Sequence, residues 1–289
     1  MRFTKMQALG NDYVYIDAIN QKLSHLPELA KFISDRHFAV GSDGMVLIYR
    51  SAHADFRMRM FNPDGTEGEM CGNALRSVGK YVYDHRLTDR TELMIETMAG
   101  IKKLWLTVTD GIVSSIRADI GEPEFNASKI PVRTRRKDFI NQTVPVLGRD
   151  FQITAVSWGN PHAVVFVDDV TNFDVEKYGR AIENMTELFP KKTNVTFAQF
   201  DNGAVAKIRE WERGTGETIS CGTGCCSAVV AGVLNGYAVQ GMAVEQRGGV
   251  MYVAWDSETN HVFLTGPSKT VFESEIDVSA IMGGNVGSH

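Results

Sequence analysis

Cysteine and long hydrophobic segments are both scarce in this sequence. Four of the 289 residues are cysteine, namely Cys71, Cys221, Cys225 and Cys226, and no two of them form a Cys-x-x-Cys pair. This content excludes a disulfide-stabilised scaffold. No segment approaches the run of about 18 apolar residues that crosses a bilayer, and residues 1–7 lack the apolar core of a secretory signal. We therefore expect a cytoplasmic protein with reduced thiols.

Positive charge is not in excess either. The chain has 30 lysine and arginine residues against 35 acidic ones, a net charge of −5. This balance argues against a nucleic acid or an anionic membrane as the main partner. None of the seven histidines has metal-ligand spacing to a cysteine, so no metal site is expected. The histidines are His25, His37, His53, His85, His162, His261 and His289.

The two halves of the chain repeat two landmarks at nearly the same spacing. Gly10-Asn11-Asp12 has a counterpart in Gly159-Asn160-Pro161, 149 residues later, and Cys71-Gly72-Asn73 has one in Cys221-Gly222-Thr223, 150 residues later. Either pair alone would carry little weight, but the agreement between the offsets indicates that one structural unit is duplicated. The length also favours two domains, because 289 residues exceed what one ordinary core needs.

Hydrophobic periodicity predicts many strands joined by glycine and asparagine turns. Phe56, Met58 and Met60 alternate with polar residues, which is the period of a half-buried strand. The regular alternation of strands and helices that marks a doubly wound parallel sheet is absent. We predict an α+β protein of two pseudo-symmetric, duplicated domains. Each is expected to be a mainly antiparallel sheet curled around a central helix, with the active site in the interdomain cleft.

The domain limits follow from the repeat. The first domain is predicted to cover residues 1–120, with the C-terminal segment 275–289 returning to it, and the second to cover 121–274. The stretch Gly121–Arg136 contains two prolines and is expected to be the linker. The central helices are expected to begin after Gly72 and after Gly222. The second of these is apolar on nearly all sides, so it should be buried.

Cys71 and Cys221 each stand immediately before a predicted central helix. The free N–H groups and the positive dipole end of a helix favour a thiolate, so we expect the pKa of these thiols to fall toward about 7. The same N–H groups can hold a carboxylate. Two thiols, one on each face of an amino acid's α-carbon, would remove a proton from one side and return one to the other. Such a pair inverts the stereocentre without pyridoxal phosphate.

Other interpretations of the cysteines stay open at this point. Burial as small hydrophobic residues is our interpretation of Cys225 and Cys226, which open an apolar helical segment. It leaves unexplained why Cys71 and Cys221 occupy duplicated positions. A thiol–disulfide redox pair lacks the local spacing of redox motifs, and a metal site lacks ligand spacing.

The motifs of the chain, taken in order, resemble the diaminopimelate epimerase family over nearly the whole length. Each motif is weak alone, but their order is highly specific. They are Lys5-Met6-Gln7-Ala8-Leu9-Gly10-Asn11-Asp12, Gly41-Ser42-Asp43-Gly44, Phe61-Asn62-Pro63-Asp64-Gly65, Glu69-Met70-Cys71-Gly72-Asn73, Gly159-Asn160-Pro161-His162, Asn194-Val195, Trp211-Glu212-Arg213-Gly214, Gly216-Glu217-Thr218 and Cys221-Gly222-Thr223-Gly224.

The resemblance implies an isomerase that converts LL-2,6-diaminopimelate to the meso form, in the synthesis of lysine and peptidoglycan precursors. Cys221 would take the proton from the LL isomer and Cys71 would supply one, with His162 and Glu212 as the catalytic groups that support the thiols. No cofactor and no metal are implied, and members of the family are usually homodimers. The implied substrate-binding residues are Asn11, Asn62, Gly72, Asn73, Asn160, Asn194, Glu212, Arg213, Gly222 and Thr223.

The sequence departs from the family pattern at a few positions. Gln7 and Ala8 stand where the family often has His-Gly, and Pro63 replaces a smaller residue. Trp211 stands where Tyr or Phe is usual, beside the residues implied to hold the distal end of the substrate. Gly44 stands where some members place a glutamine that contacts the substrate, which puts that contact in doubt.

Two further functions remain as alternatives. One is a related racemase or epimerase, independent of pyridoxal phosphate, that acts on histidine, proline or hydroxyproline. The other is a non-catalytic binding protein on the same fold. Taken singly, the asparagines would be turn formers and Glu212-Arg213 a surface ion pair. Their occurrence together, with both thiols, favours a catalyst whose substrate carries a second amino-carboxylate group.

Overall fold

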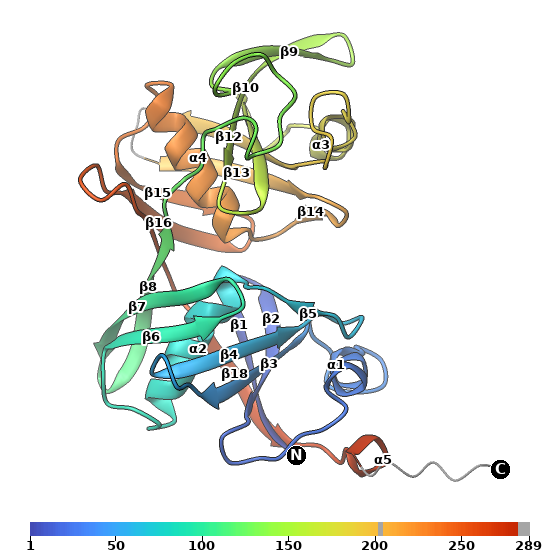
Figure 1. Cartoon of the computed structure of the whole chain (residues 1–289), viewed down its shortest axis with the longest axis vertical. Helices are drawn as coiled ribbons and strands as arrows, with labels where there is room; N and C mark the ends of the chain where they lie inside the picture. Colours follow the sequence, from blue (N-terminus) through green and yellow to red (C-terminus); the bar gives the residue numbers. More distant parts are fainter. Residues whose placement is uncertain (202–204, 283–289) are drawn as a thin grey trace, which may run out of the picture. The chain divides into compact units, whose positions relative to one another are not determined.

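The protein consists of two compact units in the computed structural model, which describes residues 1–201 and 205–282 (Figure 1). The first unit is Met1–Ala118 together with the C-terminal segment from Gly266, and the second is Asp119–Thr265. The predicted α+β class is confirmed: each unit is a mainly antiparallel sheet with a few helices.

The sheet of the first unit has the order β18-β1-β2-β3-β4-β6-β7-β8, with the short β5 paired to β4. Its neighbours are antiparallel except β2–β3 and β4–β6, which are parallel. Its elements are β1 (Arg2–Ala8), β2 (Asn11–Asp17), α1 (Leu26–Ser34), β3 (Met45–Arg50), β4 (Phe56–Phe61), β5 (Glu67–Gly68), α2 (Gly72–Asp84), β6 (Glu92–Thr97), β7 (Gly100–Thr109), β8 (Ile112–Gly121), β18 (Lys269–Glu275) and α5 (Ser279–Met282).

The second unit repeats this plan. Its order is β9-β10-β11-β12-β13-β15-β16-β17, with β14 on β13, and again two neighbouring pairs are parallel, β11–β12 and β13–β15. Its elements are β9 (Gln142–Val146), β10 (Arg149–Ser157), β11 (Pro161–Phe166), α3 (Val175–Glu183), β12 (Asn194–Asp201), β13 (Val205–Glu212), β14 (Gly216–Thr218), α4 (Gly222–Leu234), β15 (Gly241–Gln246), β16 (Gly249–Trp255) and β17 (Val262–Gly266).

Strand registers confirm the duplication residue by residue. Met60 of β4 pairs with Val46 and Gly68, and Glu210 of β13 pairs with Thr196 and Thr218. Every member of the second set follows its counterpart by 150 residues, the same offset that separates the two cysteines. Equivalent positions in the two units can therefore be compared directly.

Each sheet curls around one helix of 13 residues, as predicted. Helix α2 contacts β1, β2 and β7, and α4 contacts strands from β10 to β16. Nine residues of α4 are buried, because the helix is apolar on nearly all sides and must be covered by the sheet on several of them. Burial of Phe56, Met58 and Met60 along β4 also confirms the period-2 pattern.

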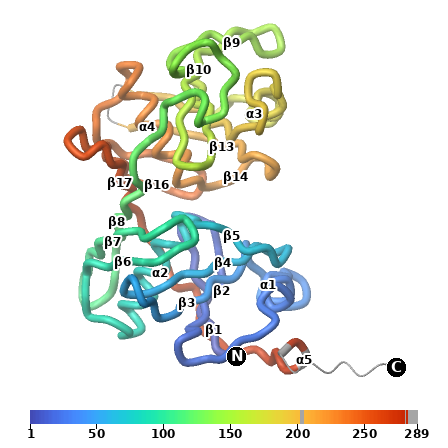
Figure 2. Tube along the Cα trace, in the orientation of Figure 1, coloured from blue at the N-terminus to red at the C-terminus, as the bar shows by residue number. Residues whose placement is uncertain are grey.

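The boundaries differ from the predicted ones in two places. The C-terminal segment joins the first unit from Gly266 rather than from residue 275, because β18 pairs with β1 over six residue pairs (Figure 2). Of the predicted segment 275–289, residues 283–289 lie outside the described part of the chain. The stretch Gly121–Arg136 is not a free linker, since Ala127, Ile130 and Val132 lie in the core of the second unit. The sequence features behind the linker prediction, two prolines and a basic run, indicate that the backbone is irregular. They do not indicate whether that backbone is buried.

Candidate functional site

Both predicted acid–base cysteines are the residues that cap the central helices. Cys71 precedes the first residue of α2 and Cys221 the first residue of α4, each with extended backbone angles. Their carbonyls accept the first helical bonds, from Leu75 N at 2.8 Å and from Cys225 N at 3.1 Å. The Cys221 sulfur accepts a further bond from Gly224 N at 3.4 Å. The helix starts therefore place a thiol at equivalent points of the two units, as the sequence predicted.

Four of the predicted residues meet beside Cys221 in the second unit. His162 of β11 is fully buried, and its Nε2 lies 3.0 Å from Thr223 Oγ1, 3.2 Å from Asn160 Nδ2 and 3.4 Å from Asn194 Nδ2. Thr223 Oγ1 lies 3.6 Å from the Cys221 sulfur. The imidazole is thus joined to the thiol through one hydroxyl.

The contacts of His162 favour one assignment of donor and acceptor to its two ring nitrogens. Both amide groups at Nε2 are donors, so Nε2 is the acceptor nitrogen and the ring proton is on Nδ1. Nδ1 lies 3.3 Å from Thr196 Oγ1, which can accept that proton, and 3.1 Å from Glu210 Oε1, whose negative charge faces it without an aligned hydrogen bond. The imidazole therefore presents a lone pair toward Thr223 and Cys221, which is the arrangement that a proton acceptor requires.

The expected low pKa of Cys221 is wrong. Burial of the thiol, followed by the negative charges of Glu210 and Glu212, raises its pKa well above the ordinary value. The bonds from Thr223 and Gly224 N act in the opposite direction and do not compensate. The helix start was visible in the sequence, whereas the two carboxylates come from β13 and reach the thiol only in the folded unit. Cys221 is therefore a thiol in the free chain.

This pKa shift predicts slow alkylation of Cys221 at neutral pH. The thiolate is the reactive form, so the rate constant for iodoacetamide should rise with a midpoint above about 8.5, the ordinary thiol value. Peptide mass mapping after timed alkylation measures the rate at Cys221, with glutathione in the same tube as the unperturbed reference. A midpoint near 7 would contradict the structure.

Glu212 and Arg213 lie at the end of β13, on the far side of the Asn194 amide. The Glu212 carboxylate accepts from Thr218 Oγ1 at 2.7 Å, and burial above all raises its pKa. Asn194 Oδ1 accepts from the backbone N–H of Arg213 at 2.9 Å, so one amide connects Arg213 to His162. The exposed Arg213 guanidinium donates to Lys191 O at 3.0 Å.

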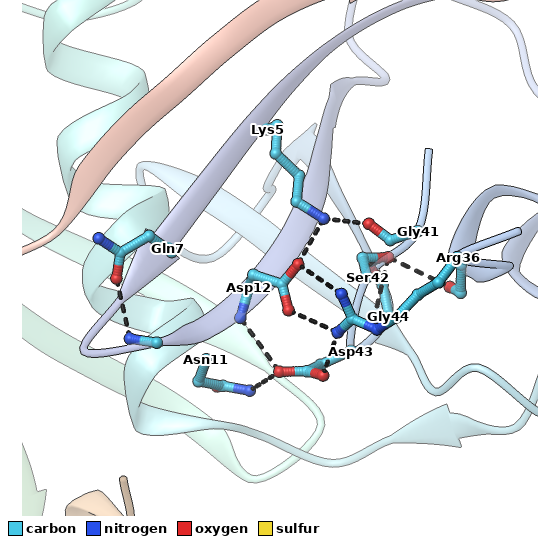
Figure 3. A network of polar contacts seen from close by, with 11 residues as sticks. Lys5, Gln7, Asn11, Asp12, Arg36, Gly41, Ser42, Asp43 and Gly44 are labelled. Carbon is cyan, nitrogen blue, oxygen red and sulfur yellow. Dashed lines mark hydrogen bonds and ion pairs between the residues drawn. The ribbon is translucent and has the colours of Figure 1, made fainter. Parts of the chain in front are cut away.

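Asn11 is the predicted residue that lies beside Cys71 in the first unit. Asn11 Oδ1 lies 3.5 Å from the Cys71 sulfur, and its Nδ2 donates to Asp43 Oδ2 at 2.8 Å. Asp43 is itself held by Arg36 Nη2 at 2.8 Å and accepts from Asp12 N at 3.1 Å (Figure 3). The carboxylate thereby orients the amide with its oxygen toward the thiol.

Asp12, the residue that follows Asn11, belongs to the same network. It forms ion pairs with Lys5 and Arg36 (Figure 3). Burial alone would raise the pKa of Asp12, but the bonds from Arg36 and Lys5 hold it below the usual range. The Lys5 ammonium also donates to Gly41 O. The network therefore ties the β1–β2 turn, which carries Asn11, to the segment 36–44.

The other predicted residues of the first unit are placed more loosely. Asn62 follows β4 and bonds within its own turn, its Nδ2 donating to Thr66 Oγ1 at 3.0 Å. The buried Asn73 accepts from Arg76 Nη2 at 2.6 Å through its side chain. A side chain at Gly44 is excluded, because a Cβ there would lie 2.3 Å from Phe61 O and the φ of +150° is strained for other residues. The substrate contact considered at Gly44 is thus limited to its backbone.

Three residues that the sequence did not single out belong to these clusters. Tyr13 is bonded to Cys71 and Asn11, and burial, followed by the Cys71 charge, raises its pKa. Asp43 orients Asn11, and Glu210 faces His162.

His162, Glu210 and Cys221 have ligand atoms within 4.8 Å of one another, a set that could hold a metal ion. The members of these clusters lie far apart in the sequence, so arguments from residue spacing do not predict them.

Comparisons with known proteins identify the family of the chain. The diaminopimelate epimerase family model matches residues 3–125 and 154–271. A curated diaminopimelate epimerase of Methanococcus maripaludis (strain C5) is 49% identical over 278 residues, covering 96% of this chain and 100% of that protein. The one of Acetivibrio thermocellus is 47% identical over 281 residues, covering 97% and 100%.

Solved structures share the fold at much lower identity. A PhzF-family phenazine biosynthesis protein of Bacillus anthracis has a TM-score of 0.66 and 21% identity, covering 96% of this chain and 99% of that one. A probable proline racemase of Agrobacterium radiobacter has a TM-score of 0.68 and 15% identity, covering 97% and 94%. These likenesses show the fold alone. No helix of the described residues is long and apolar enough to cross a membrane.

Proposed function

Because the chain belongs to the diaminopimelate epimerase family, we propose that Cys71 and Cys221 are the two proton-transfer groups of its reaction. That reaction is the epimerisation of diaminopimelate, an isomerisation, here from the LL to the meso form. The observation that carries the proposal is the thiol at the start of each central helix, at positions 150 residues apart in a duplicated fold. Cys221 takes the α-proton of the LL isomer, and Cys71 supplies one to the opposite face.

The helix starts also explain how the reacting carboxylate is held. Backbone N–H groups of the first turn have no partner within a helix, and in α2 and α4 these belong to Gly72-Asn73 and Gly222-Thr223. Loss of the α-proton sends negative charge into the carboxylate, so N–H donors aimed at it stabilise the transition state more than the ground state. No cofactor is needed to absorb the charge.

The resting thiol form of Cys221 assigns a role to His162. A thiol of raised pKa is protonated at rest, so a neighbouring acceptor must take its proton before the sulfur can act as a base on the LL isomer. His162 Nε2 is that acceptor, with Thr223 Oγ1 between them. Glu212 is the second group that we expect to support this thiol, and burial raises the pKa of its carboxyl group.

The remaining predicted residues suit the distal amino-carboxylate group of the substrate. The Arg213 guanidinium can bind a carboxylate through two parallel bonds, and the Glu212 carboxylate can accept from an ammonium. The amides of Asn62, Asn160 and Asn194 can serve either group, and Asn11 bonds to the Cys71 thiol. Racemases of proline or hydroxyproline are less well supported, because the solved structure of a probable proline racemase shares only 15% identity with this chain.

Solvent exchange tests the proposal. The freshly reduced protein, incubated with LL-diaminopimelate in deuterated water and a metal chelator, should introduce deuterium at the α-carbon and form the meso isomer. Mass spectrometry and chiral chromatography measure the two products. Absence of exchange under these conditions would refute the proposed reaction chemistry, and exchange that requires pyridoxal phosphate would refute its independence of a cofactor.

We further propose that the enzyme acts in the cytoplasm as a homodimer, in the synthesis of lysine and peptidoglycan precursors. The scarcity of cysteine pairs and the use of reduced thiols support the cytoplasm as its location. The substrate of the family supports the biosynthetic role, and the usual state of its members supports the dimer. Sedimentation equilibrium would measure the mass of the assembly against the 32.0 kDa chain.

Removal of the Asp43 carboxylate should weaken catalysis through Asn11. In Asp43→Ala the Asn11 amide loses the acceptor at 2.8 Å that orients it toward Cys71. A lost bond to a charged group is worth about 1.5 kcal/mol, which corresponds to about a tenfold lower kcat/KM. Steady-state kinetics with LL-diaminopimelate measure the loss, and Asp43→Asn, which keeps an acceptor oxygen, should lose less. An unchanged kcat/KM in Asp43→Ala would remove Asp43 from this role.

A further inference from the structure

Glu210 is a buried carboxylate that the family's implied residues do not include. It lies on β13 with 3% of its surface exposed, and its Oε1 is 3.1 Å from His162 Nδ1. Among the described residues neither of its oxygens has an aligned hydrogen bond. A Cβ at Gly224 would lie 2.5 Å from Oε2, so the carboxylate packs directly against the first turn of α4. A buried charge with so few partners is costly to fold.

The duplicated fold shows that this charge is not required for packing. The equivalent of Glu210 in the first unit is Met60, which pairs with Val46 of β3 and Gly68 of β5 at the same register. Met60 is 5% exposed, so an apolar side chain fills this position equally well. The equivalent of His162 is Tyr13, 149 residues earlier. At these two equivalent positions the first unit therefore has a tyrosine and a methionine, and the second unit has a histidine and a glutamate.

We propose that Glu210 is a positioning residue for proton transfer at Cys221. Its charge, 3.1 Å from Nδ1, favours the tautomer with the proton on Nδ1, so that Nε2 accepts, and it stabilises the imidazolium that forms when Cys221 ionises. The inference rests on the proposed function of Cys221. In the step itself the Cys221 S–H proton passes to Thr223 Oγ1 while the Thr223 hydroxyl proton passes to His162 Nε2. A thiolate and an imidazolium result, and no net charge is gained or lost.

Distance decides which effect of the Glu210 charge prevails. The charge repels the Cys221 thiolate and attracts the His162 imidazolium, and Coulomb energy falls with separation. His162 Nδ1 is in direct contact at 3.1 Å, and the donor atoms of all three residues lie within 4.8 Å of one another. The attraction acts at contact distance, so the carboxylate favours the state in which the proton has moved to His162. An aspartate orients and stabilises a catalytic histidine in the same way in serine proteases.

The test compares Glu210→Met, Glu210→Gln and Glu210→Asp. Glu210→Met installs the residue that the first unit carries, so it should fold, with a thermal midpoint at or above that of the native chain. We expect kcat for LL-diaminopimelate to fall about 100-fold in the Met and Gln variants with KM unchanged. Glu210→Asp keeps the charge and should recover part of the loss. All assays contain a chelator, so that a metal ion held by His162, Glu210 and Cys221 does not contribute.

A spectroscopic measurement separates this role from a structural one. In ¹⁵N-histidine-labelled protein the His162 signals, assigned with His162→Gln, should show the Nδ1–H tautomer in the native chain. They should show a mixture of tautomers in Glu210→Met. A kcat within twofold of native in Glu210→Met, or a loss of kcat with an unaltered tautomer, would overturn the inference. Activity retained by Cys221→Ala would instead refute the proposed function on which it rests.

Discussion

Replacement of Cys221 or Cys71 by alanine is expected to abolish epimerisation, with kcat lowered by about 10⁴-fold. In the proposed mechanism each thiol serves one face of the α-carbon, so the loss of either interrupts both directions of the reaction. The variants keep one thiol and are expected at most to exchange the α-hydrogen of one isomer, without inversion. Chiral chromatography measures the inversion, and deuterium incorporation measured separately for the LL and meso isomers shows which face each remaining thiol serves.

Cys225→Ala is the matched control for these variants. Cys225 is fully buried in α4, only four residues after Cys221, and its change removes a thiol from the same helix turn. Because Cys225 packs as a small hydrophobic residue, the variant should retain most activity and lose a modest part of its stability. Full activity in Cys71→Ala or Cys221→Ala would refute the two-base model, and complete inactivity in Cys225→Ala would show that the assay reports packing of α4.

Arg213→Ala should also produce a large loss of activity, through substrate binding. A guanidinium that binds the distal carboxylate through two bonds contributes about 3 kcal/mol when its loss leaves that charge unpaired, so kcat/KM should fall about 100-fold. The loss should appear in KM first, because Arg213 does not touch the reacting carbon. The backbone N–H of Arg213 still holds Asn194 in the variant, so the His162 cluster keeps its amide.

Arg213→Lys separates charge from geometry at this position. Lysine keeps the positive charge but loses the planar fork, so an intermediate kcat/KM is expected. An amino acid without a distal carboxylate provides the second control, because its slow exchange should be equal in the native chain and in Arg213→Ala. A kcat/KM for diaminopimelate that is unchanged in Arg213→Ala would place the distal carboxylate elsewhere.

Local sequence signals predicted the elements that carry the site. A thiol followed by glycine, a polar residue and an apolar helical pattern identified the starts of α2 and α4, because helix starts are specified by neighbouring residues. Strand periodicity predicted β4, and the repeat predicted that the two halves share one fold. The roles of Asn11, His162 and Arg213 followed from the resemblance and stay predictions. The structure does place Asn11 beside the Cys71 sulfur, and it joins His162 to Cys221 through Thr223.

The protonation of Cys221 is where the sequence argument failed. The helix start is a local feature and favours a thiolate, but Glu210 and Glu212 approach from β13 and desolvation follows from the whole fold. A pKa is the sum of burial and all nearby charges, and only the start of α4 is encoded next to the cysteine. The same reason hid Glu210 and Asp43, since each acts on a residue more than thirty positions away.

The sequence by itself therefore determined the family, the duplicated architecture and the positions of the two thiols at the helix starts. These depend on short motifs, on periodicity and on the constant offset of about 150 residues. The tertiary structure alone decided that Cys221 is held as a thiol, that His162 presents Nε2 as an acceptor, and that a glutamate stands in one unit where a methionine packs in the other. Those properties arise from charges and burial that strands distant in the sequence bring to one point.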